Sequence, residues 1–408
     1  MSLAAPTIDL LRREPGSRGF FAAHAQSSLG TGAAYVALLV LAYDRLHSPW
    51  AITLILLADM VPPTVLGPFC GAAADRWSRR WCAVVADAIR AVAFVGIGLA
   101  PGFAPMLALA LLAGTGAALF RPAILAGLPG LVHEDRLAPA TSLYGALEDL
   151  GHTLGPVLAA GLLLVAAPES VMVANGATFA ISALVLTRVP LGAAPSQPTT
   201  SLLRQTRDGF RATMENRVLR CLIVASSSIL LFAGFFNVGE LLLAKDTLGA
   251  GSSGYSVLVA VFGVGVVAGS LVGSKGGSID EIGSRYLGGL LLVAVAFVAC
   301  GLAPVYWAAL AAFAAGGVGN GLVLVHERLL LQKLVPDRLM GRVFGVKDAL
   351  TSGAFGAGFV CAGLLLPAID TRLLFVLAGV GVLAVWVAAS LVLRPTWAAG
   401  RTVPAPAV

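Results

Sequence analysis

A small set of ionisable residues lies inside long apolar stretches of this sequence, where a charge is costly and is by default a candidate for function. Glu148 and His152 are four residues apart, so they share one face of a helix, and Asp149 lies beside them. A carboxylate next to a histidine in a low-dielectric setting can titrate near neutral pH. The group therefore indicates either a proton-transfer site or a self-paired cluster that lines an aqueous vestibule.

Two more acids occupy similar surroundings. Asp59 stands well inside the apolar segment ILLADMVPP and has no partner nearby in the sequence. It is interpreted either as a proton or substrate site, or as a structural residue whose partner comes from another helix. Glu240 is a further candidate proton or substrate residue, but it is only five residues from Lys245, so we expect it to be solvated.

Other polar residues in the apolar stretches suggest a cavity and a gate. The candidates for lining a cavity are His24, Gln26, Tyr35 and Asn237. The candidates for a cytoplasmic gate, at the end of one stretch and the start of the next, are Glu327, Arg328, Lys347 and Asp348. Asp87 and Arg90 are three residues apart in one stretch and are expected to pair with each other.

Membrane-spanning helices must position these residues. The 408 residues are 58% hydrophobic and only 12% charged, with a mean hydropathy of +0.89, which is too little polar surface for a water-soluble globule. The apolar runs are about 20 residues long, enough for a helix to cross a bilayer. We expect an all-α integral membrane protein whose twelve spans are 20–43, 50–74, 80–100, 104–126, 139–165, 169–188, 219–244, 253–274, 284–303, 305–326, 339–366 and 371–393.

The basic residues predict the orientation of these spans. With a cytoplasmic N-terminus, 23 of the 27 basic residues fall in cytoplasmic loops and tails and 3 in outer loops, while Arg90 lies within a span. The positive-inside rule therefore places both termini in the cytoplasm. The net charge of +6 is explained by this asymmetry and requires no nucleic-acid partner.

The two halves of the chain resemble each other. The stretch from Asp135-Arg136-Leu137 to Gly161 recurs from Asp337-Arg338-Leu339 to Gly363, an offset of 202 residues. Such an offset is the mark of a duplication of six spans. The expected organisation is a cytoplasmic lead at 1–19, a six-helix bundle at 20–188, a cytoplasmic linker with an amphipathic segment at 189–218, a second bundle at 219–393 and a cytoplasmic tail at 394–408.

A charged knot, GAAADRWSRR, separates the second and third spans. Its pattern resembles the loop between helices 2 and 3 of the major facilitator superfamily, with Ser78 where that family usually has glycine. The matching residues are Gly71, Asp75, Arg76, Arg79 and Arg80. The resemblance covers the whole chain and implies two six-helix bundles. It also implies that the knot is a conformational latch, in which Gly71 allows close helix approach and the arginines pair with acidic groups or lipid phosphates.

The fifth span carries a second resemblance. Gly151, Gly155 and Pro156 resemble the glycine-rich, kinked helix 5 of proton-coupled drug exporters in this superfamily. Longer stretches look like the branch that includes enterobactin-type and macrolide efflux permeases. The resemblance implies a secondary active transporter of the bacterial inner membrane, functional as a monomer, that exports a small amphipathic molecule such as a drug or siderophore in exchange for protons.

Three alternatives remain open at this point. The chain could be an uncoupled facilitator, an importer of the same fold, or a non-transporting membrane sensor or assembly factor. The five cysteines form no CxxC pair, and neither a nucleotide-binding motif nor a catalytic constellation is present, so we expect no metal, no cofactor and no enzymatic activity.

Overall fold

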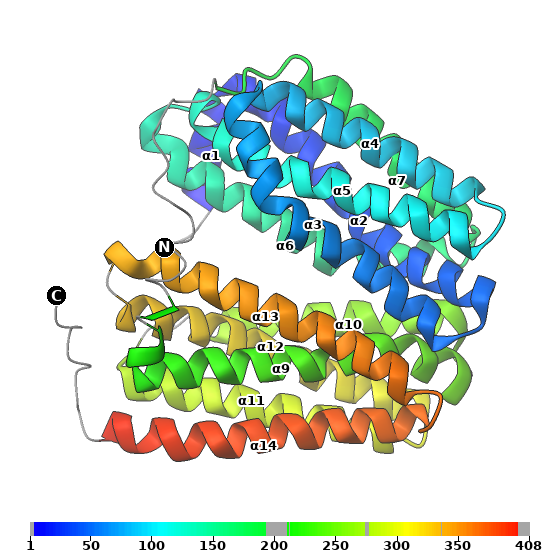
Figure 1. Ribbon diagram of the computed structural model, residues 1–408, viewed down its shortest axis with the longest axis vertical. Helices are drawn as coiled ribbons and strands as arrows, with labels where there is room; N and C mark the ends of the chain where they lie inside the picture. The colour runs from blue at the N-terminus through cyan, green and yellow to red at the C-terminus, as the bar shows by residue number, and fades with distance from the viewer. Residues whose placement is uncertain (1–3, 193–209, 212, 274–276, 336, 399–408) are drawn as a thin grey trace. The chain divides into compact units, whose positions relative to one another are not determined.

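The computed structural model describes residues 4–192, 210–211, 213–273, 277–335 and 337–398. These residues form helices joined by short turns, without a strand in any of these ranges (Figure 1). Eleven helices within them are long and apolar enough to cross a membrane. α6 (Leu137–Leu162) is not among the eleven, although it lies where the fifth span is predicted. The prediction of an all-α membrane protein is confirmed, and the count of spans agrees to within one.

The remaining helices follow the predicted spans closely, except α1, which lies in the predicted lead and matches no predicted span. They are α1 (Ala4–Arg13), α2 (Pro15–Leu46), α3 (Pro49–Arg76), α4 (Arg79–Leu99), α5 (Phe103–Gly127), α7 (Pro168–Leu186), α9 (Arg217–Leu242), α10 (Gly251–Gly273), α11 (Ile279–Leu302), α12 (Tyr306–Leu334), α13 (Asp337–Leu365) and α14 (Thr371–Ala398). A π-helical turn, Leu243–Thr247, follows α9. The largest disagreement is at α12, which continues to Leu334 although its span is predicted to end at 326.

Local sequence signals begin and end several helices. Proline at the first position starts α2, α3 and α7, because its fixed φ suits the first turn and its missing N–H is not needed there. Asn216 caps α9 by accepting hydrogen bonds from the backbone N–H groups of Val218 and Leu219. Ser278 and Glu281 form a capping box at the start of α11. These caps satisfy donors that the membrane would otherwise leave unpaired.

The chain divides into two compact units, residues 1–197 and 198–408, and each is described by itself. In unit 1, α2 packs against α6 and α7, α4 against α5 and α7, and α3 against α5. In unit 2, α9 packs against α13 and α14, α11 against α12 and α14, and α10 against α12. The same six-helix pairing therefore occurs twice.

The boundaries of the predicted domains stay predictions. Most of the linker at 189–218 lies outside the described residues, as does most of the tail at 394–408. The predicted lead at 1–19 contains α1 and the start of α2. Here Arg136 pairs with Glu14 at 2.6 Å and with Asp9 at 3.8 Å, and Leu10 is fully buried, so α1 is anchored to unit 1.

Glycines allow close helix crossings in both units. A Cβ added at Gly32 of α2 would overlap the carbonyl of Gly151 on α6, and one at Gly155 would overlap the backbone of Gly32. In unit 2, a Cβ at Gly234 of α9 would lie 2.8 Å from Gly358 of α13. Small residues at such crossings are how membrane helices reach van der Waals contact. The close packing expected for Gly151 and Gly155 is therefore present.

Candidate functional site

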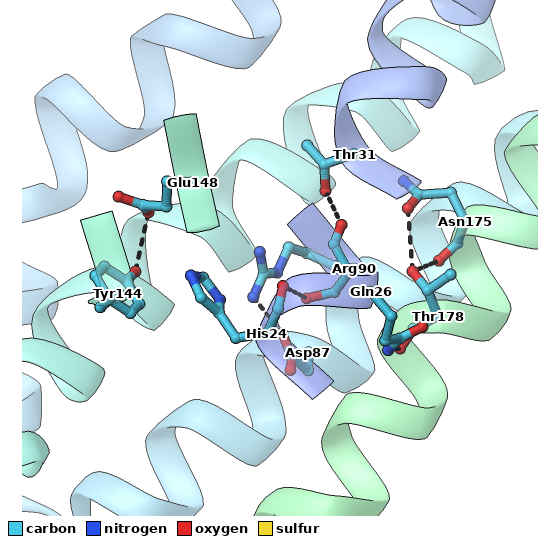
Figure 2. Close-up of polar contacts among 10 residues, drawn as sticks. His24, Gln26, Thr31, Asp87, Arg90, Tyr144, Glu148, Asn175 and Thr178 are labelled. Atoms are coloured by element: carbon cyan, nitrogen blue, oxygen red, sulfur yellow. Dashed lines mark hydrogen bonds and ion pairs between the residues drawn. The ribbon is translucent and has the colours of Figure 1, made fainter. Parts of the chain in front are cut away.

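The interior of unit 1 holds a charged pair. Asp87 and Arg90, both on α4, form the expected ion pair, and Asp87 has no exposed surface (Figure 2). The Arg90 guanidinium lies over the rings of Phe120 on α5, at 4.1 Å, and Phe179 on α7, at 4.3 Å. A cation between two aromatic faces is attracted by the negative faces of both rings. Its charge is thus held from three helices.

A second group of polar side chains adjoins this pair from α2 and α6. His24 stacks on Tyr144 with ring centroids 4.3 Å apart, and the Tyr144 hydroxyl donates to Glu148 at 3.0 Å (Figure 2). His24 is only 5% exposed, and neither of its ring nitrogens has a hydrogen-bond partner among the described residues. His24 is therefore embedded in aromatic rings within this structure, and its lining of a cavity stays a prediction.

The other candidate proton-site residues of unit 1 differ in exposure. Asp59 on α3 and Asp149 and His152 on α6 present exposed side chains, whereas Glu148 is half-buried. Asp59 lies close enough to His152 for their charges to interact. Both interpretations of Asp59, as a proton or substrate site and as a structural residue, stay predictions. Asp59, Glu148, Asp149 and His152 are named the polar face of α3 and α6.

Gln26, another candidate cavity residue on α2, is hydrogen-bonded to α7. Gln26 donates through Nε2 to the carbonyl of Thr178 at 2.7 Å, and Thr178 is itself bonded to Asn175 (Figure 2). Tyr35 is half-buried further along α2. These contacts hold α2 against α7, so a cavity-lining role for Gln26 and Tyr35 stays a prediction.

The environment of Glu240 in unit 2 differs from the expectation. Glu240 is only 5% exposed, and the hydroxyl of Tyr255 on α10 donates to it at 3.0 Å. The prediction of solvation was wrong because the chain turns through the π-helical segment after α9 and α10 covers the carboxylate. Asn237, one turn earlier, bonds to the carbonyl of Ala233 in its own helix at 3.0 Å.

The predicted gate residues divide into a buried pair and two exposed charges. Glu327 on α12 pairs with Lys347 on α13 at 3.1 Å, and Ser226 on α9 donates to the same carboxylate. The three helices are thereby joined within unit 2. Arg328 and Asp348, the neighbours of this pair in the sequence, are exposed. A gating function for the four residues stays a prediction.

The described residues of the charged knot differ in their contacts. Within unit 1, a Cβ at Gly71 would meet open space, and the close helix approach expected at this glycine stays a prediction. Arg79 is buried and donates to the carbonyl of Ala126 at the end of α5 at 2.7 Å. Arg76 is exposed, and Arg80 lies beside the ring of Trp81. The side chain of Asp75 lies outside the described part, and the latch stays a prediction.

Comparison with known proteins identifies the family. The family model of the Major Facilitator Superfamily matches residues 20–346. The chain belongs to this superfamily. It is 25% identical to a putative bacilysin exporter of Bacillus subtilis over 88% of this chain and 90% of the relative. It is 21% identical to macrolide efflux protein A of Streptococcus pyogenes over 88% of this chain and 91% of the relative.

Solved structures support the fold. The nucleoside transporter NupG superposes on this facilitator-superfamily protein with a TM-score of 0.73, at 13% identity, over 93% of this chain and 99% of that one. The protein is therefore a multi-pass membrane transporter of the Major Facilitator Superfamily and not an enzyme. No cluster of residues that could hold a metal ion occurs in the ranges that the structure describes.

Sequence reasoning missed three features of the site in this transporter. It gave no role to Phe120, Phe179 or Tyr144, because an aromatic residue in an apolar span carries no signal of what it faces. One clue was available, since Tyr144 stands four residues before Glu148 and therefore on the same helix face. The sandwich of Arg90 depends on contacts from three helices and had no such clue.

Proposed function

We propose that the protein is a proton-coupled exporter of a small amphipathic molecule, such as a drug, siderophore or other metabolite, and that it works by alternating access. The polar face on α3 and α6 supports this proposal most directly, because Asp59 and His152 bring an acid and a histidine from two helices into electrostatic contact. Such a pair can exchange a proton for a cationic or polar part of a substrate. The similarity to a putative bacilysin exporter and to a macrolide efflux protein favours export.

The other candidate residues have distinct roles in this proposal. Glu148 and Asp149 extend the polar face of unit 1, and Glu240 is a protonatable group in unit 2. The residues proposed to line the substrate path are His24, Gln26, Tyr35 and Asn237. The knot from Gly71 to Arg80 acts as a latch, Glu327 with Lys347 anchors the cytoplasmic gate beside Arg328 and Asp348, and Pro156 bends α6.

The proposal also places the protein in the cell. It lies in the inner membrane of a bacterium with both termini in the cytoplasm, where its basic loops face the anionic leaflet. It acts as a monomer, with lipid around it and no nucleic-acid partner. The positive-inside asymmetry of the sequence supports this orientation.

The decisive experiment measures proton movement in liposomes that contain the purified protein and a trapped pH-sensitive dye. A macrolide and bacilysin are added outside as probes, together with a panel of siderophores. The proposal expects probe-triggered proton flux that is lost in Asp59→Asn and Glu148→Gln and kept in Asp280→Asn, an exposed acid at the start of α11. Probe uptake without a proton signal, unchanged in both variants, would contradict coupling and leave an uncoupled facilitator.

A further inference from the structure

The Asp87–Arg90 pair is built in a way that packing alone does not require. Asp87 has no exposed surface and stands about 12 Å along α4 from Arg79, well inside the membrane. Buried charges in membrane helices are costly and mark functional positions. Only Oδ1 of Asp87 pairs with Arg90, and Oδ2 has no hydrogen-bond partner within the described part of the chain, although the Ser182 side chain on α7 also interacts with the carboxylate. One carboxylate oxygen is therefore available to a proton.

Arg90 remains held when Asp87 is neutral. Its guanidinium lies over the rings of Phe120 and Phe179, and a Cβ at Gly116 would lie 2.8 Å from its Cγ, so its stem fills the space that this glycine leaves open. The two ring faces stabilise the cation whatever the state of the carboxylate. Protonation of Asp87 thus removes one of the contacts of Arg90 and leaves the others.

The groups that face the pair connect it to the rest of unit 1. From α2 comes His24, from α6 come Tyr144 and Glu148, and from α5 comes Arg121, whose charge acts on Tyr144. From α7 come the ring of Phe179, which faces the Arg90 guanidinium, and the hydroxyl of Ser182, which faces the Asp87 carboxylate. Figure 2 shows Arg90 between Asp87 and His24. A change in charge at Asp87 therefore acts first on Arg90 and then on His24, Tyr144 and Glu148.

We propose that Asp87 is a buried proton-binding residue of this transporter, which takes a proton on Oδ2 and releases Arg90 from its ion pair. The inference rests on the proposed proton coupling and extends it from the exposed acids to the interior. With Asp87 ionised, the Arg90 guanidinium is held by the Asp87 carboxylate of the same helix, α4. With Asp87 protonated, the positive charge acts on Glu148 through the His24–Tyr144 stack that joins α2 to α6.

Infrared difference spectroscopy tests proton binding without any transported probe. The full-length protein in lipid is titrated between alkaline and acidic buffer, and the carbonyl stretch of protonated carboxyl groups is recorded. We expect Asp87→Asn to lose one component of that band and Asp280→Asn to keep the wild-type band. A band that is unchanged in Asp87→Asn would overturn the proposal.

If Asp87→Asn does not reach the membrane, Asp87→Glu gives the same answer. The titrating component must then move to the frequency of a protonated glutamic acid, and a component that stays in place would overturn the proposal. This spectrum is independent of transport. Loss of the component in a protein that shows no proton flux would thus refute the proposed coupling while the proton site stands.

A double variant separates proton binding from simple ion pairing. Asp87→Asn with Arg90→Gln replaces the pair by two neutral groups that can bond to each other. If the pair were only structural, this double variant would restore the pH dependence of probe-driven flux that Asp87→Asn loses. We expect no restoration, with proton flux at least tenfold below wild type while exchange of the probe across the membrane persists. Restored flux would overturn the proposal.

Discussion

The two units share one pattern of helix packing but have different centres. Gly116 of unit 1 lies against Ala86 and Arg90, and Gly319, 203 residues later, lies against Gly289 and Val293 in the same way. Where unit 1 has Asp87 and Arg90, unit 2 therefore has Leu290 and Val293, both buried. The fold forms with either set, so the charged pair is not needed to build a six-helix bundle of this kind.

Unit 2 fills its centre with phenylalanine. The ring of Phe236 on α9 packs against Phe262, Phe297, Phe313 and Phe375, with centroid separations from 4.4 to 5.5 Å. Such a cluster buries much apolar surface and contains no group that can change charge. The difference is confined to this place in each unit: unit 2 is apolar around Leu290, Val293 and Phe236, where unit 1 has an ion pair, although unit 2 buries Glu240 and Glu327 elsewhere.

The units also solve one problem by different routes. Arg45, at the end of α2, donates to the carbonyls of Ala100 and Gly102 after α4. In unit 2, Arg372 at the start of α14 donates to the carbonyls of Gly301 and Ala303 after α11. Both arginines satisfy carbonyls that a helix end leaves unpaired. The unpaired carbonyls occur at equivalent helix ends in the two units, whereas the arginines that bond to them come from different positions of the repeat.

The largest loss of stability is expected for Arg90→Ala. It leaves Asp87 buried without its partner, and we expect unfolding to become easier by about 3–5 kcal/mol. The matched change in unit 2, Val293→Ala, removes two methyl groups and should cost about 1.6 kcal/mol. Thermal unfolding in detergent measures both, and equal losses in the two variants would contradict a special role for charge in unit 1.

The arginine caps should matter equally in both units. Arg45→Ala and Arg372→Ala each remove charged hydrogen bonds to carbonyls, and we expect a loss of about 1.5–3 kcal/mol for either. The pair of Arg45 with Glu169 at 3.7 Å adds little, because Glu169 is partly exposed. The same thermal assay applies, with the exposed Arg188→Ala as the control expected to change nothing. A large loss for one cap alone would show that the two are not equivalent.

The glycine crossings give a further test of equivalence. Gly155→Ala in unit 1 and Gly358→Ala in unit 2 each push a Cβ into a neighbouring helix backbone, which should cost about 1–3 kcal/mol. A Cβ at Gly161 of α6 meets nothing, so Gly161→Ala serves as the control and should be neutral. Differential scanning of the purified variants would reveal whether either crossing tolerates the methyl group. Tolerance at Gly155 would mean that α2 and α6 separate more easily than the structure shows.

The smallest change in stability is expected for a double variant that gives unit 1 the central residues of unit 2. Asp87→Leu with Arg90→Val gives unit 1 the residues of unit 2, and apolar side chains often replace a buried ion pair without loss. We expect stability within about 1 kcal/mol of wild type or above it, together with loss of proton-driven transport. A variant that is stable and still transports against a gradient would show that the pair serves neither purpose.

Much of the fold could be predicted from residue patterns. The runs of about 20 apolar residues predict the helices because only a helix satisfies its own backbone in lipid. The prediction was poorest at α12, where the charged and polar residues after His326 suggest an end but remain helical to Leu334. The pairing of Asp87 with Arg90 was predictable too, because it depends on one turn of one helix.

The contacts of most candidate site residues could not be predicted from residue patterns. The burial of Glu240 depends on α10, which brings Tyr255 over it from 15 residues away, and the spacing to Lys245 pointed in the opposite direction. Arg79 bonds to the end of α5, 47 residues away. Neither contact has a local signal.

Hydropathy, charge asymmetry and repeat spacing are properties of the chain alone, and they predict a helical membrane protein with a repeated six-helix plan. That the protein is a transporter follows from its membership of the Major Facilitator Superfamily. Only the tertiary structure decided which polar residues meet. Arg90 lies between Phe120 and Phe179, and His24 lies on Tyr144, because α4, α5, α7, α2 and α6 converge there. Side chains from different helices become neighbours through packing, and packing depends on every helix at once.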